Sequence, residues 1–263
     1  MDGFPVFITK ARSKRRLNVA KEVSTINRLR LNFERTLTGK LIRLFERTGR
    51  RAARDYKRGA QFGALAGDLE RQLLDVMRPH YREVISLFAG RMFDGYKLEP
   101  RFEQLLDKYL LLFAAQRITG ITNTTRNIIR GAIFAGEAEA LGVAAIADLI
   151  VERTGGAMGR SRAATIARTE THGAASYAQY EAAEQMPLTF LKEWNSVGDS
   201  RTRPHHAAMN GVQVGEGEDF VVRVNGQEYR MAHTHDPRGG AVNNINCRCV
   251  TLYIADEDEI FRD

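Results

Sequence analysis

Sulfur and imidazole side chains gather in the last third of this chain. Five of the six histidines, both cysteines and the single tryptophan lie beyond residue 165. Together, His206, Cys247 and Cys249, with His233 or His235 as a further candidate, offer the imidazole and thiolate ligands that zinc prefers. Alternate residues of a strand point to the same face, however, so a Cys-x-Cys pair is equally typical of a buried core. We therefore expect no cofactor, with a zinc site on these three residues as the alternative.

The same region could instead form an enzyme active site. A metal-dependent nuclease or toxin-like enzyme would need a histidine general base and further ligands on a following helix. The candidate residues are His206, His233, His235, Cys247 and Cys249. After Cys249 the sequence predicts a strand, which leaves the second half of such a site missing. Cysteine–histidine catalysis with Asp199 orienting His206 lacks a predicted oxyanion hole. The sequence favours a protein that is not an enzyme.

Arginines in the same region alternate with acidic residues. Guanidinium groups pair bidentately with carboxylates, so such residues usually satisfy one another inside a small polar network. The arginines are Arg201, Arg203 and Arg248, and the acids are Asp199, Glu170 and Asp236. We expect these pairs to hold a loop-rich domain together in preference to binding phosphate. Trp194 is expected to anchor the core of that domain.

The order of these groups along the chain is specific as a set. They are Ala167-Arg168-Thr169-Glu170, Trp194, Asp199-Ser200-Arg201-Thr202-Arg203 with His206, Asp236-Pro237, and Asn246-Cys247-Arg248-Cys249. Residues 163–254 with this pattern resemble the C-terminal domain of the phage Mu F-like family of minor head morphogenesis proteins. His233-Thr234-His235 departs from the family, which more often has a proline and small residues there.

The resemblance implies a low-copy head protein of a tailed phage or prophage. It would be made in the bacterial cytoplasm and built into the virion, inside the head near the portal. Its implied partners are portal, capsid or scaffold proteins, with double-stranded DNA as a further partner and no membrane. The implied role is head morphogenesis, with retention or delivery of DNA.

Positive charge is concentrated at the start of the chain. Residues 1–58 hold 17 Lys and Arg against 5 Asp and Glu, although the whole chain carries a net charge of only +7. This asymmetry indicates a polyanionic partner, bound without sequence specificity and sensitive to salt; the alternative is a solvated helix face. The predicted contact residues are Lys10, Arg12, Lys14, Arg15, Arg16, Arg28, Arg30, Arg50 and Arg51.

Composition places the chain among globular proteins. It has 263 residues, 43% of them hydrophobic and 27% charged. The longest nearly apolar run, Tyr109–Ala115, is far shorter than the roughly 20 residues that cross a bilayer, and residues 1–8 do not read as a signal peptide. Two cysteines exclude a disulfide-stapled scaffold and indicate a reducing compartment.

The elements that must position these groups change type near Pro187. Before it, apolar residues recur at helical spacing, with Pro79 and Pro100 separating segments and residues 102–117 forming a central packing helix. After it, strands are predicted over 188–194, 220–224, 228–232 and 249–254, with a type I′ turn at Asn225-Gly226. The sequence predicts an α+β protein with antiparallel strands. The expected divisions are a helical, basic region (1–160), a head morphogenesis domain (161–256) and an acidic tail (257–263).

Overall fold

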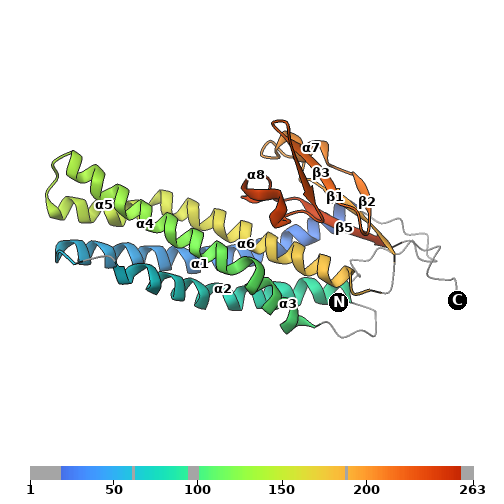
Figure 1. The fold of residues 1–263 in the computed structure, drawn as a ribbon, viewed down its shortest axis with the longest axis horizontal. Coiled ribbons are helices and arrows are strands. Elements are labelled where there is room, and N and C mark those ends of the chain that lie inside the picture. The colour runs from blue at the N-terminus through green and yellow to red at the C-terminus, as the bar shows by residue number, and fades with distance from the viewer. Residues whose placement is uncertain (1–18, 61–62, 94–100, 187–188, 256–263) are drawn as a thin grey trace. The chain divides into compact units, whose positions relative to one another are not determined.

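The computed structural model describes residues 19–60, 63–93, 101–186 and 189–255, and confirms the α+β class (Figure 1). The main helices are α1 (Val19–Lys57), α2 (Gly63–Met92), α3 (Phe102–Tyr109), α4 (Ala115–Ala138), α5 (Val143–Gly155) and α6 (Ala157–Ala183). The strands are β1 (Phe190–Asn195), β2 (Gln213–Gly215), β3 (Phe220–Val224), β4 (Gln227–Met231) and β5 (Val250–Ala255). Short helical segments are η1 (Leu110–Ala114), α7 (Pro204–Ala208), η2 (Pro237–Gly239) and α8 (Gly240–Asn244).

The chain forms two compact units, and each is assembled from separate stretches of sequence. Among the described residues, unit 1 comprises 19–32, 81–93, 101–107, 168–186 and 189–255, and unit 2 comprises 33–60, 63–80 and 108–167. Helices α1, α2 and α6 each contribute residues to both units. The predicted division after residue 160 falls inside α6 and stays a prediction, while the acidic tail at 257–263 lies outside the described residues.

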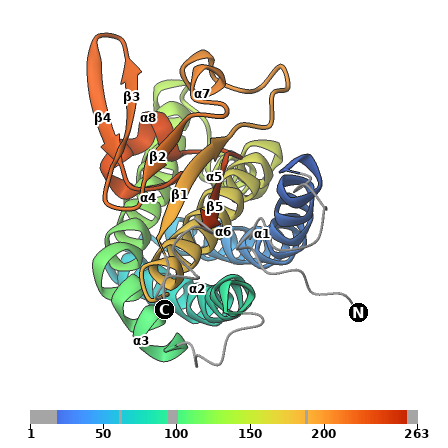
Figure 2. The ribbon, with the colours of Figure 1, turned by 90° about the vertical axis from the view of Figure 1, so that its right-hand side faces the viewer.

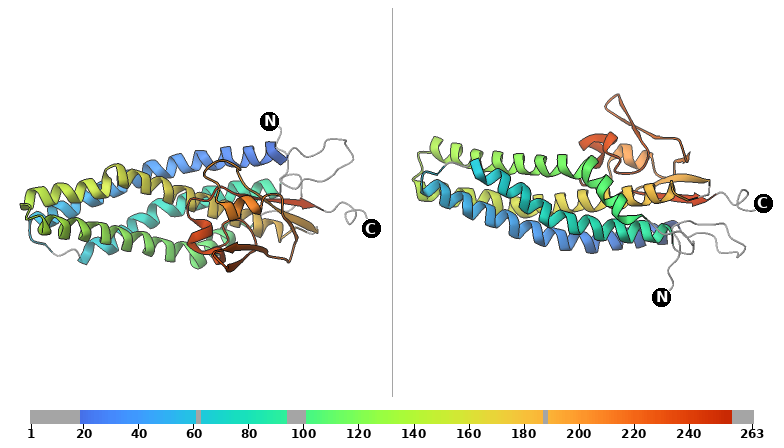
Figure 3. Two further views of the ribbon diagram at one scale, coloured as in Figure 1. Left: turned by 90° about the horizontal axis from the view of Figure 1, so that it is seen from above. Right: turned by 60° about the horizontal axis from the view of Figure 1, so that its bottom comes forward.

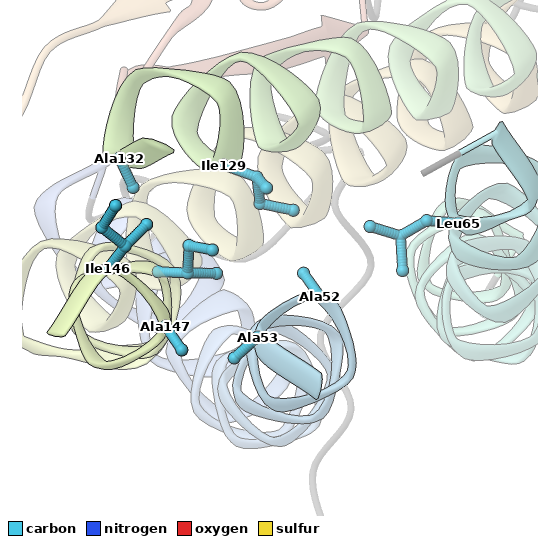
Figure 4. Close-up of a cluster of buried hydrophobic side chains, with 8 residues drawn as sticks. Ala52, Ala53, Leu65, Ile129, Ala132, Ile146 and Ala147 are labelled. Carbon is cyan, nitrogen blue, oxygen red and sulfur yellow. The ribbon is translucent and has the colours of Figure 1, made fainter. Parts of the chain in front are cut away.

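Unit 2 is helical. Figures 1 and 3 show α4 and α5 side by side, joined by a tight connection. Small and branched side chains from four helices form its core, and Figure 4 shows them meeting between the helix axes. They are Ala52, Ala53, Leu65, Ile129, Ala132, Ile146, Ala147 and Ile150. Four of these residues are alanine, whose small side chain lets the helix backbones approach closely. The core of unit 2 is therefore tightly packed.

Two helical predictions are wrong in detail. Pro79 does not separate two helices but lies exposed inside α2, whose buried stripe continues past it from Met77 to Tyr81. Packing of that stripe outweighs the one backbone hydrogen bond that proline removes. Residues 102–117 are not one central packing helix, because η1 is a π-helical turn between α3 and α4. This turn directs Leu111 outward, where it is 81% exposed.

Unit 1 contains the strands (Figure 2). The three-stranded antiparallel sheet has the order β2-β1-β5, with Trp194 opposite Thr251. A separate hairpin, β3–β4, closes through Asn225 and Gly226, whose φ angles of 50° and 80° confirm the predicted turn. The sequence missed β2, which is only three residues long. Across the segments described, none of the helices combines the length and the apolar character needed to cross a membrane.

Candidate functional site

Three potential metal ligands converge in unit 1. Pro204 occupies the first turn of α7 and starts this short helix, which places His206 toward the loop before β5. His206 Nδ1 lies 3.6 Å from Cys247 Sγ and 3.6 Å from Cys249 Sγ. All three side chains are buried, and their ligand atoms lie within 4.8 Å of one another. The structure therefore brings together the three residues that the sequence offered as zinc ligands.

Asn243 selects the tautomer of the His206 ring. The Asn243 amide nitrogen donates to the carbonyl of Gly239 at 2.8 Å, which orients the amide oxygen toward His206 Nε2 at 3.2 Å. An amide oxygen can only accept, so Nε2 carries the proton. Nδ1 is left with a lone pair that faces both sulfur atoms.

The two thiols differ in acidity. Cys249 hydrogen-bonds to Cys247, which lowers the pKa of the Cys247 thiol well below its ordinary value and raises the pKa of Cys249 above it. The imidazole of His235 and the hydrogen bond with His206 lower the pKa of Cys247 further. Cys247 is therefore the thiol that most readily becomes the thiolate that binds metals.

Two further buried histidines lie in the segment after β4. His233 has its Nδ1 2.7 Å from the carbonyl oxygen of Thr234, its ring is 5.1 Å from that of Tyr180, and burial lowers its pKa to about 4. His235 is 2% exposed, and its ring interacts with Cys247. Neither ring nitrogen of His235 makes a well-formed hydrogen bond within the described structure, and the Cys247 thiol is the group that interacts with the ring.

A polar frame surrounds the cluster. Arg248 donates both terminal nitrogens to Asp199, at 2.6 and 2.7 Å, and so holds the pKa of this carboxyl well below its ordinary value. Arg201 donates to the same carboxylate at 3.4 Å. Arg203 instead donates to the carbonyl of Ile245 at 2.6 Å. The expected arginine–acid pairing is thus confirmed for Arg201 and Arg248. It is wrong for Arg203, whose guanidinium donates to a backbone carbonyl.

Helix α6 binds the loop that carries the cysteines. Arg168 donates to the Asn246 side chain at 2.6 Å, and the Asn246 backbone N–H donates to Thr169 Oγ1 at 3.0 Å. The buried carboxylate of Glu170 accepts from Tyr81 of α2 at 2.8 Å. Residues of two motifs, 77 and 78 positions apart in the sequence, are therefore bonded to each other.

Asp236 closes the turn after the histidines. Its carboxylate accepts from the backbone N–H groups of Ala232 and Arg238, at 2.7 and 2.9 Å, and caps η2. The Arg238 side chain also bonds this carboxylate and spans to Asp219. Asp236 was expected to pair with one of Arg201, Arg203 and Arg248; its partner Arg238 is nearer in sequence.

Trp194 is fully buried, as expected of a core anchor. Its ring packs edge-on to those of His206 and Phe220, each with 5.4 Å between centroids. Cys247 and Cys249 belong to the same apolar cluster. A small surface depression reaches this cluster from outside, lined by His206, both cysteines and the frame arginines Arg201, Arg203 and Arg248.

The predicted partner-binding arginines do not all face outward. Arg28 and Arg50 are exposed, whereas Arg51 is half-buried and pairs with Asp68 at 2.6 Å. Arg30 is wrong as a contact residue, because it is 0% exposed and donates to the Cys249 carbonyl and Ser176 Oγ at 3.0 and 2.9 Å. The remaining predicted contacts lie outside the described residues: Lys10, Arg12, Lys14, Arg15 and Arg16.

Sequence reasoning missed Asn243 and the structural role of Arg30. The repeated asparagine in Asn243-Asn244 was the only local signal for the first. Arg30 lies 219 positions from Cys249, and no local pattern reports a contact at that separation.

The site thus lies in a small antiparallel domain that follows helical segments and whose sequence motifs are bonded to one another. The family model described as "Phage Mu protein F like protein" matches residues 122–252, and through this segment the chain belongs to the phage Mu F-like family. The match confirms the resemblance and extends it back from residue 163 into α4. Membership supports a role in phage heads and association with the virion, among other head proteins.

One curated relative is an enzyme by name. NAD(+)--arginine ADP-ribosyltransferase EFV of Enterococcus faecalis (strain ATCC 700802 / V583) is 32% identical over 139 residues. The match covers 51% of this chain and 26% of that protein, so the chain spans about a quarter of the length of this relative. No solved structure matches the chain.

Proposed function

We propose that this protein is a non-enzymatic minor capsid protein that acts in head morphogenesis through contacts with portal, scaffold or capsid proteins or with DNA. The observation that carries the proposal is the internal bonding of the family's polar motif. The polar side chains of the motif hydrogen-bond to one another within the fold: Arg248 to Asp199, and Arg168 to Asn246. A catalytic site needs such groups aimed at a substrate.

The histidines support a structural role over a nuclease. His206, His233 and His235 are all buried, whereas a general base must reach its substrate's proton. Cys249 is followed directly by strand β5, where a nuclease of this kind would carry a helix with further ligands. His206 lines the surface depression, but no helix with further ligands follows Cys249 in the described part of the chain, which supports a structural role over a nuclease.

Helix α1 supplies a surface for an acidic partner. Exposed basic residues recur along it at steps of three and four, which places them on one helix face. They are Arg43, Arg47, Arg50, Arg54 and Lys57. A stripe of this kind attracts phosphates electrostatically and without sequence preference. In our proposal it contacts DNA or an acidic protein surface inside the head, near the portal.

The proposal is tested in the phage or prophage that encodes the chain. Purified DNA-filled heads are analysed by quantitative mass spectrometry, with and without deletion of the gene, and a plasmid copy is used for complementation. We expect the chain in heads at a copy number far below that of the major capsid protein, and a loss of infectious particles on deletion. Absence of the chain from purified heads would overturn the proposal.

The absence of catalysis is tested separately. The purified full chain is assayed for plasmid nicking with Mg²⁺, Mn²⁺ or Zn²⁺, and for transfer of labelled ADP-ribose from NAD⁺ to an arginine-containing acceptor. The second assay addresses the activity named for the enterococcal relative. We expect no turnover in either. Activity that His206→Ala abolishes, in a variant that keeps the wild-type circular dichroism, would favour the enzyme alternative.

A further inference from the structure

We propose that unit 1 holds a structural zinc ion on His206 Nδ1, Cys247 Sγ, Cys249 Sγ and the ring of His235. The inference is independent of the role in phage heads, because it concerns how this domain is held together. Three of the ligands converge from α7 and the loop before β5, and the fourth comes from the segment after β4. The ion would join these pieces, which have little regular structure of their own.

The distances fit zinc. Zinc lies about 2.3 Å from thiolate sulfur and about 2.0–2.1 Å from imidazole nitrogen, so tetrahedral coordination separates nitrogen from sulfur by about 3.6 Å. The separation from His206 Nδ1 is 3.6 Å to each cysteine sulfur. The two sulfurs are thus placed equivalently about the nitrogen, as two ligands of one ion would be.

Hydrogen bonding explains this arrangement less well. Because Nε2 donates to Asn243, His206 Nδ1 has a single lone pair, and one lone pair accepts one good hydrogen bond. Two thiols nonetheless lie at the same distance from it. A metal ion between the three atoms satisfies the lone pair and both sulfurs at once.

Asn243 acts as a positioning residue. A zinc-bound imidazole almost always donates its other ring N–H to an oxygen, which fixes its tautomer and orientation. Asn243 provides that oxygen at 3.2 Å, and its own amide is held by the carbonyl of Gly239. The support that zinc requires around His206 is therefore already built.

His235 is the independent observation that points to a ligand. A buried imidazole without partners is costly, because each unsatisfied polar atom loses its bond with water. Neither nitrogen of His235 makes a well-formed hydrogen bond among the described residues, although the ring interacts with the Cys247 thiol. His235 lies outside the group of three ligand atoms within 4.8 Å of one another, so its ring has to approach them to reach the ion. A bond to the ion gives one of these nitrogens its partner. Four protein ligands close the site, which makes it structural and leaves no position for substrate.

The first test uses the wild-type full chain, purified without chelator. We expect about one zinc per chain by inductively coupled plasma mass spectrometry. Replacement by Co²⁺ should give sulfur-to-cobalt charge-transfer absorption and the intense d–d bands of a tetrahedral site. X-ray absorption of the zinc protein should show two sulfur and two nitrogen ligands. Zinc-free protein that also fails to give the cobalt spectrum on reconstitution would overturn the proposal.

Variants separate ligands from neighbours. Cys247→Ser and Cys249→Ser should each lose most of the bound zinc and weaken the cobalt charge-transfer band. For Asn243→Ala we expect a loss of zinc affinity of about 10–100-fold with the same cobalt spectrum in shape. His205→Asn is the matched control, because His205 neighbours His206 on α7 but is only half-buried and, unlike His235, is not a hydrogen-bonding neighbour of Cys247. This variant should keep one zinc per chain.

His235→Ala tests the fourth ligand. We expect weaker zinc binding and one fewer nitrogen ligand in the absorption spectrum. Wild-type affinity together with an unchanged cobalt spectrum would overturn the assignment of His235. Each variant is checked for folding by circular dichroism. The wild-type cobalt and absorption spectra decide the proposal even where a variant does not fold.

Discussion

Arg28 and Arg30 are two positions apart on α1 and face opposite environments. Arg28 is exposed to solvent, whereas the guanidinium of Arg30 is buried, with Cys249 and Ser176 as acceptors and the ring of Phe88 5.9 Å away. A buried guanidinium that bonds a carbonyl beside β5 holds α1 to the loop that carries the cysteines. We therefore assign Arg30 to the fold of unit 1 and Arg28 to its surface.

Replacing each of these two arginines should distinguish a buried structural residue from a surface residue. We expect Arg30→Ala to lower the free energy of unfolding by about 2–4 kcal/mol, because it leaves buried acceptors unpaired and opens a cavity. Arg28→Ala should change it by less than about 0.5 kcal/mol, as surface substitutions usually do. Urea unfolding followed by circular dichroism measures both values, and equal effects would contradict the assignment.

His80 makes the stability of unit 2 depend on pH. It is buried edge-on to Phe33, and burial, with a smaller contribution from the charge of Lys40, lowers its pKa to about 4. Below pH 6.5, the ordinary pKa of histidine, His80 binds a proton in the unfolded chain. In the folded chain it stays neutral until the pH approaches 4. The stability of the fold with a neutral His80 is therefore fully present above pH 6.5 and is progressively lost as the pH falls toward 4.

We expect His80 to cost about 2 kcal/mol of stability between pH 7.5 and pH 5. His80→Gln removes the titrating group, so its free energy of unfolding should fall less over this interval, whatever its value at pH 7.5. Urea titrations of both proteins at the two pH values give the difference. Parallel pH profiles would show that His80 is not the group responsible.

At the scale of elements, close helix contacts rest on glycine. A Cβ atom added to Gly49 of α1 would overlap Thr154 Oγ1 of α5, and this hydroxyl already donates to the carbonyl of Ile150. Thr154 is buried and has little freedom to move aside. These two helices can therefore approach only because position 49 has no side chain.

Gly49→Ala should destabilise the protein by about 1–3 kcal/mol, since it overpacks this contact. Gly120→Ala is the matched control, because a Cβ at this exposed position of α4 meets nothing within 4 Å. We expect the control to stabilise by about 0.5–1 kcal/mol, through the better helix propensity of alanine. Thermal unfolding of the two variants checks the opposite signs; destabilisation by both would refute the packing argument.

The distribution of charge belongs to the whole molecule. Residues 1–58 carry a large excess of positive charge, while the rest of the chain has more acidic than basic residues. The exposed face of α1 retains part of this excess in the folded protein. Attraction to DNA through such a surface arises from counterion release and falls steeply with salt.

We expect Arg47→Gln with Arg54→Gln to reduce the slope of log binding constant against log salt by about 2, for double-stranded DNA of arbitrary sequence. The double variant Arg126→Gln with Arg130→Gln is the control. Both residues are exposed on α4, and their substitution removes the same amount of positive charge. Fluorescence anisotropy at several salt concentrations gives both slopes. An equal reduction in both would show that the attraction follows net charge and not the α1 stripe.

Short-range features of this protein followed from its sequence. The four predicted strands, the Asn225-Gly226 turn and the long helices depend on periodicity and backbone preference within a few residues. The ordered motifs also identified the family, because they are read one after another along the chain.

Tertiary structure decided which polar groups meet. The burial of Arg30, the placement of His235 beside Cys247, and the support of His206 by Asn243 all join residues distant in sequence. The assembly of each unit from separated stretches likewise lies beyond local signals. The physical reason is that helix and strand preferences act over one or two turns of chain. Contacts of this kind form only when packed elements exclude water and leave each polar atom to find a partner.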